Sequence, residues 1–168
     1  MAKREHLFWT LCAAHCIDLM LEDIGKNIAK VKIALKKSMA INDYIHSSVA
    51  LVNLMRRFTN QRNLHRPAVT RFATSFITLS CIYKQKNNLR KMVTSQEWSN
   101  SKWSKDAGGK KIASYNLQES YWKNILYALK LTSPLVKVLC MVDGDKKPSK
   151  GYIMRIWIEL RRLLLTAF

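Results

Sequence analysis

Apolar residues recur every three or four positions along most of this chain, which is the spacing of one face of an α-helix. The first such segment covers residues 12–24, and Gly25 is expected to end it because glycine commonly follows the last turn of a helix. Residues 28–39 repeat the pattern among four lysines, and residues 44–58 repeat it again before a polar stretch. These three segments are predicted to be amphipathic helices.

The same spacing continues through the middle of the chain. The longest predicted helix covers residues 68–92, because its apolar positions repeat at helical intervals and no breaker intervenes. Residues 94–111 are polar and end in Gly108 and Gly109, which predicts a short helix followed by an exposed loop. Residues 117–142 are predicted to form another helix, with a kink at Pro134.

The two ends of the chain carry other patterns. Residues 6–10 are aromatic and apolar, which predicts a short buried strand that runs into the first helix. Residues 143–151 are predicted to form a turn, and residues 152–168 to form a last amphipathic helix. The pattern therefore indicates a mostly α fold with one strand near its start.

Charge narrows the class of partner. The 168 residues contain 29 Lys and Arg against 11 Asp and Glu, a net charge of +18, which favours a polyanionic partner. No apolar run reaches the length of a membrane span, so no transmembrane segment is expected. Binding of the basic helix predicted at residues 152–168 to an acidic membrane is a third alternative, but such helices are common without membranes, so no membrane partner is expected. Residues 3–17 resemble a secretory signal, but His15 and Asp18 interrupt the apolar face, so we expect an intracellular protein that is not secreted.

A long segment without acids provides the candidate binding residues. Between Asp43 and Glu97 there is no Asp or Glu, whereas basic residues are frequent. Arginine binds phosphate through paired hydrogen bonds, and aromatic rings stack on bases. We therefore predict that this segment binds nucleic acid. The alternative is a solvated basic face without a partner. The candidates are Arg56, Arg57, Arg62, Arg66, Arg71, Phe72, Lys84, Lys86, Arg90 and Lys91.

Templates for metal and nucleotide sites fit less well. Cys12, His15 and Cys16 share one helix face, which geometrically permits zinc, but no further ligand has paired spacing. The alternative is that the cysteines pack as small hydrophobic residues and that His15 forms a hydrogen bond inside the core. Residues 105–111 lack the first glycine and the Ser or Thr of a P-loop. We therefore expect no metal, no cofactor and no small-molecule substrate.

Two longer strings resemble a known family. The run His6-Leu-Phe-Trp-Thr-Leu-Cys-Ala-Ala-His through Gly25 resembles plant hAT superfamily transposases, in which a Cys-x-x-His element opens a helix of the RNase H-like core. Cys12 and His15 occupy that element. The block from Met55 to Phe76 resembles the family's Thr-Arg-Trp segment, with Phe72 in place of the commoner Trp. The resemblance continues to about residue 152.

This resemblance implies a division of the chain and a role in binding DNA. Residues 1–25 would be part of an RNase H-like core and residues 26–153 a helical insertion region. Family members cleave DNA with three acids that hold Mg²⁺, and those acids lie before the Cys-x-x-His element and after the insertion. The resemblance therefore implies a noncatalytic, nuclear DNA-binding fragment, with His15 and Arg71 facing DNA and Phe72 stacking near the cut site.

The C-terminal residues 154–168 depart from the pattern of the family. Residues 154–161 match a one-base-shifted reading of codons for the family's continuing helix, except at Ile156, so we interpret residues 154–168 as a divergent, frameshifted tail. The alternative function is a domesticated basic helical module that binds nucleic acid or a related transposase-like protein. Both readings predict a binding protein rather than an enzyme.

Overall fold

The computed structural model describes residues 12–65, 72–142 and 158. The predicted strand at residues 6–10 and the predicted turn at residues 143–151 lie outside the described residues. Of the predicted tail helix only Ile158 is described, and it is helical and exposed.

The described residues are helical with short connections, and they contain no strand, so the mostly α prediction is confirmed for this part of the chain. The helices in chain order are α1 (Ala13–Asn27), α2 (Ala29–His46), α3 (Val49–Phe58), α4 (Ala73–Lys84), α5 (Lys86–Thr94), α6 (Gln96–Ser99), α7 (Lys102–Lys105), α8 (Ala107–Leu117) and α9 (Glu119–Val142).

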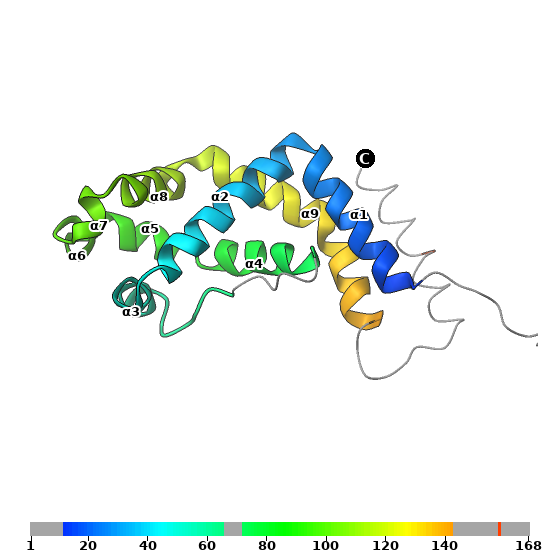
Figure 1. Cartoon of the computed structure of the whole chain (residues 1–168), viewed down its shortest axis with the longest axis horizontal. Helices are drawn as coiled ribbons and strands as arrows, with labels where there is room; N and C mark the ends of the chain where they lie inside the picture. The colour runs from blue at the N-terminus through cyan, green and yellow to red at the C-terminus, as the bar shows by residue number, and fades with distance from the viewer. Residues whose placement is uncertain (1–11, 66–71, 143–157, 159–168) are drawn as a thin grey trace, which may run out of the picture.

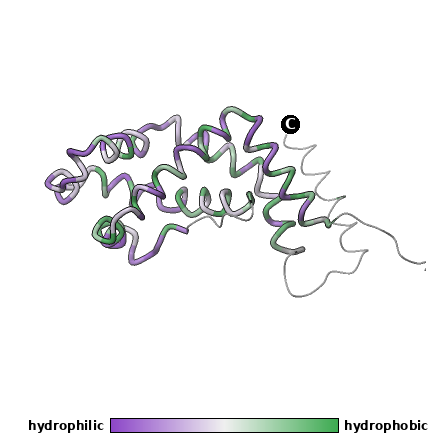
Figure 2. The backbone as a smooth tube through the Cα atoms, viewed as in Figure 1, coloured by the Kyte–Doolittle hydropathy of each residue, from purple (hydrophilic) through white to green (hydrophobic). Residues whose placement is uncertain are grey.

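Helix α9 is the central packing element. It packs against α1, α2 and α4, and α5 to α8 extend to one side together with α3 (Figure 1). Hydrophobic and hydrophilic residues alternate along the longer helices, so each of these has an apolar side to bury (Figure 2). As expected, α9 continues through Pro134, and its axis bends in its last third (Figure 1).

Two fully buried aromatic residues fix the start of α9. The Tyr121 hydroxyl lies 2.8 Å from the Ser38 hydroxyl of α2, and burial raises the Tyr121 pKa. The Trp122 indole N–H donates to the Asn116 carbonyl at the end of α8, at 2.8 Å. These bonds satisfy polar atoms that burial would otherwise leave unpaired, and they connect α9 to both neighbours.

The helix predicted over residues 68–92 is in fact two helices. Within the described part, α4 ends at Lys84 and α5 begins at Lys86, with the buried Gln85 between them. The Gln85 backbone N–H donates to the Ile82 carbonyl at 3.0 Å, as in a tightened last turn. A break of one residue barely changes the apolar period, so the sequence pattern did not reveal it.

The segment 44–58 is also divided. Helix α2 ends at His46 and α3 begins at Val49. The Ser47 hydroxyl donates to the Tyr44 carbonyl at 2.7 Å, which satisfies an acceptor at the end of α2.

The expectation of an exposed loop at Gly108 and Gly109 is wrong, because both residues lie in the first turn of α8. The Asp106 carboxylate accepts hydrogen bonds from their backbone N–H groups at 3.0 and 3.3 Å and caps the helix. A Cβ on Gly109 would overlap the Trp103 carbonyl oxygen, so this glycine permits close packing of α7 on α8.

Gly25 does not end α1, which continues to Asn27. Gly25 is buried, and a Cβ there would lie 2.5 Å from Cζ of the Phe72 ring. About two turns before Gly25 on α1, the Asp18 carboxylate accepts hydrogen bonds from the backbone N–H groups of Phe72 (3.4 Å) and Ala73 (3.0 Å). The glycine therefore admits the Phe72 ring, while Asp18 caps α4 from another helix.

We expect Gly25→Ala to lower the free energy of unfolding by about 1 kcal/mol, because overpacking against Phe72 outweighs the better helix propensity of alanine. In a Phe72→Ala background the same change should be neutral or stabilising by up to about 1 kcal/mol. Urea unfolding followed by circular dichroism measures both effects. Stabilisation by Gly25→Ala in the otherwise unchanged protein would contradict this account of the glycine.

Candidate nucleic-acid interface

The two arginines at the end of α3 already have partners within the protein. The Arg56 Nε donates to Asn63 Oδ1 at 2.6 Å. The Arg57 guanidinium pairs with the Glu97 carboxylate of α6 at 2.9 Å, and Arg62 is exposed. The acid-free segment is therefore not acid-free in space, because the fold brings an acid to it from 40 positions away.

A second acid engages two more of the predicted basic residues. The Glu119 carboxylate at the start of α9 pairs with Lys86 at 3.0 Å and with Arg90 at 2.8 Å. Hydrogen bonds from Lys86 and then Arg90 hold the pKa of Glu119 below its usual range. Arg90 also donates to the carbonyls of Asn116 (3.1 Å) and Leu117 (3.4 Å), so it caps the C-terminal end of α8.

The remaining predicted basic residues are spread over different elements. Lys84 lies exposed at the end of α4, and Lys91 lies exposed on α5. Arg66 and Arg71 are outside the described residues. The described basic residues of the predicted set thus occupy α3, the connection after it, α4 and α5, and several of them already have protein partners.

The described residues of the family-like motif, Cys12 and His15, lie at the start of α1, which packs against α4. His15 is exposed one turn before Asp18, and Cys12 is exposed next to the first residue of α1. The alternative of a core hydrogen bond for His15 is therefore wrong. Phe72 is half-buried, with its ring centroid 5.8 Å from that of Phe76. Within the described ranges, no group of three or more His, Cys, Asp or Glu side chains is arranged to hold a metal ion.

A basic surface that the sequence analysis did not single out follows α9. Lys123, Lys130 and Lys137 recur every seven residues, which places them on one exposed side of the helix with a rise of about 10.5 Å between neighbours. Among the residues that the structure describes, no acidic side chain pairs with any of the three. Their charges therefore face solvent without compensation.

Helix α2, which packs against α9, carries two further lysines with defined positions. The Lys30 Nζ lies 5.4 Å from the centroid of the Tyr127 ring of α9. The Lys37 Nζ lies 4.8 Å from the centroid of the Tyr115 ring of α8. Cation–π contacts of this kind hold the side chains at defined positions while the charge stays near the surface. We call these five residues the lysine ridge: Lys30, Lys37, Lys123, Lys130 and Lys137.

The signal for the ridge was present in the sequence as a seven-residue lysine repeat within the segment 117–142. A search for long acid-free segments misses it, because Glu119 precedes the repeat and Asp143 follows it. The structure shows that Glu119 is engaged by Lys86 and Arg90, so it leaves the ridge uncompensated.

The comparisons with known proteins give one match. Residues 1–56 match a family model described as a domain of unknown function (DUF659), a domain found in hAT-type transposase-like proteins. The matched segment includes α1, α2 and most of α3. Neither a curated protein nor a solved structure matches the chain.

In the described ranges, no helix is both long and apolar enough to cross a membrane.

The Asp106 cap makes part of the fold sensitive to acid. Asp106 accepts a hydrogen bond from the Tyr44 hydroxyl at 2.9 Å, and this bond, followed by the backbone N–H of Gly109, holds the Asp106 pKa below its usual range. Desolvation by burial is the main cause that raises the Tyr44 pKa to about 12. Because the Asp106 pKa is depressed in the folded state, its charged form favours folding at neutral pH.

We expect the stability that Asp106 contributes to be complete above its ordinary pKa of 3.8 and to be lost as the pH falls through its lower native pKa. Asp106→Ala should therefore reduce the free energy of unfolding at pH 7, and its difference from the unchanged protein should shrink toward pH 3. Urea unfolding across this pH range measures the difference. The matched control is Asp43→Ala on the exposed side of α2; an equal pH-dependent loss there would contradict a specific role for the cap.

Proposed function

We propose that this chain binds nucleic acid through the lysine ridge, without base-sequence preference, as part of a hAT-type transposase-like protein. The observation that carries the proposal is the presence of five lysines on the two packed helices α2 and α9, with no acidic partner among the described residues. The net charge of +18 and the match of residues 1–56 to a domain found in such proteins support it.

The geometry of the ridge suits a phosphate backbone better than base edges. From Lys123 to Lys137 the helix rises by about 21 Å, which corresponds to about six base pairs of duplex at 3.4 Å each. Lysine acts as a flexible point charge, whereas base recognition relies more on bidentate arginine, asparagine or glutamine. Contacts of this kind position a protein on the duplex but read no sequence.

We further propose that the chain contributes binding and no strand cleavage, and that it acts in the nucleus. The resemblance to hAT transposases supports both statements. For the lack of cleavage the specific reason is that the family's Mg²⁺-binding acids belong to segments outside the matching strings. The basic residues of α3 to α5 that already pair with Glu97 and Glu119 would then add weaker, secondary contacts.

We expect the unchanged protein to lose affinity for a 20-base-pair duplex by about 500-fold between 50 and 200 mM salt, if all five ridge lysines contact phosphates. Replacement of Lys30, Lys123 and Lys130 by glutamine should reduce the slope of log affinity against log salt by about three. Fluorescence anisotropy with two duplexes of unrelated sequence measures both quantities.

The matched control replaces Lys105, Lys110 and Lys111 by glutamine. These lysines are also exposed, and their replacement removes the same charge. They lie in α7 and α8, before and after Asp106 in the sequence. Equal losses in the two triple variants would show that binding depends on net charge alone, and strong selection between the two duplexes would contradict a phosphate-only interface.

We also expect no cleavage of supercoiled plasmid DNA when the purified protein is incubated with Mg²⁺ or Mn²⁺, because two-metal cleavage needs acids that hold both ions. Agarose electrophoresis of nicked and linear products is the measurement. Metal-dependent nicking that disappears when one particular Asp or Glu is changed to alanine would overturn the noncatalytic proposal.

A further inference from the structure

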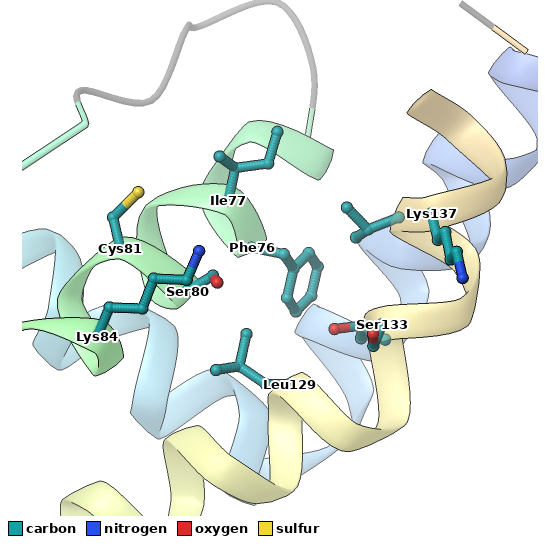
Figure 3. Close-up of a pocket in the computed structure, with 10 residues that line it drawn as sticks. Phe76, Ile77, Ser80, Cys81, Lys84, Leu129, Ser133 and Lys137 are labelled. Carbon is teal, nitrogen blue, oxygen red and sulfur yellow. The ribbon is translucent and has the colours of Figure 1, made fainter. Parts of the chain in front are cut away.

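An apolar groove of about 370 Å³ lies between α4 and α9 (Figure 3). Phe76 and Ile77 of α4 line one side, and Leu129 and Val136 of α9 line the other. The groove is open to solvent, unlike an enclosed pocket that surrounds a small ligand.

The floor of the groove offers no unpaired polar group at its deepest position. Thr132 is fully buried there, and its hydroxyl donates to the Ala128 carbonyl at 2.8 Å. The small side chains Ser80 and Ser133 leave space between the two helices. An occupant would therefore be recognised first by apolar contact and not by hydrogen bonds to the floor.

Positive charge lies at both ends of the groove. Lys84 from α4 and Lys137 from α9 stand on opposite sides of the apolar floor (Figure 3). In the part of the chain that the structure describes, neither lysine has an acidic partner. The groove thus combines an apolar centre with two cationic ends, which complements an apolar segment with negative charge at each end.

Charge also discriminates among the possible occupants. A second copy of the chain would bring another net charge of +18 to a basic surface. Residues 143–168 contain six Lys and Arg against three Asp and Glu, so 6 − 3 gives +3, and this segment is also poorly matched. An acidic partner has neither disadvantage.

We propose that the groove binds an amphipathic α-helix of an acidic partner protein. Leu129 and Lys137 are eight residues apart, about 12 Å along α9, which matches two turns of a helix. Apolar residues at positions i, i+4 and i+7 of the partner would enter the groove, and acidic residues beyond them would meet Lys84 and Lys137. This site shares Lys137 with the lysine ridge and is separate from the other four ridge lysines, which do not line the groove.

The test uses a phage-displayed library of helical peptides, selected on the full chain. We expect the enriched peptides to carry apolar residues at i, i+4 and i+7 with Asp or Glu near both ends. Their affinity should fall at least tenfold for Lys84→Glu, which reverses one end, and for Ser80→Trp, which fills the groove. The matched control Lys91→Glu changes the same charge on α5 and should retain affinity within twofold.

Three results would overturn the proposal: no enrichment, enrichment of peptides without acids, or equal loss of affinity for Lys84→Glu and Lys91→Glu. If Ser80→Trp does not unfold cooperatively in urea, the comparison of the two lysine variants decides the question. The Ser80→Trp variant should bind duplex with an unchanged slope of log affinity against log salt, because it fills the groove and keeps every ridge lysine. Duplex binding by this variant therefore tests the ridge independently of the groove. Failure of peptide binding with duplex binding intact would therefore reject the groove alone.

Discussion

The burial of Tyr121 and Trp122 at the start of α9 is the interaction on which the arrangement of this molecule depends. The Tyr121 hydroxyl meets Ser38 of α2, and the Trp122 indole meets the end of α8, so one turn of α9 is fixed from two directions. The remainder of α9 then buries one side against α1, α2 and α4. Its opposite side is exposed by necessity, and that side carries the repeated lysines.

The two strings that resemble hAT transposases come together in space although they are about 50 residues apart. Asp18 of the first string caps the helix that begins beside Phe72 of the second string, and Gly25 makes room for the Phe72 ring. An aromatic residue at position 72 thus has a structural explanation in addition to any contact with DNA. The proposed surface on α9 and α2 does not depend on that residue.

Helical periodicity was sufficient to predict most of the longer helices, because each of them buries an apolar side. It could not locate the breaks at Gln85 and Ser47, since one or two residues outside a helix shift the apolar positions only slightly. It also gave the wrong structure for Gly108 and Gly109, where a distant Tyr44 and a nearby Trp103 determine the packing. The charge pattern was misleading for a similar reason, because ion pairs such as Arg57 with Glu97 form only after folding.

The lysine ridge also has an energetic cost for the folded protein. Neighbouring lysines of the α9 row lie about 10.5 Å apart along the helix axis, close to the Debye length of about 10 Å at 0.1 M salt, so they repel one another most at low ionic strength. A ligand that binds only the folded state raises its stability by mass action. A polyanion on the ridge would therefore relieve this repulsion and stabilise α9, which couples the folding of the domain to the ionic composition around it.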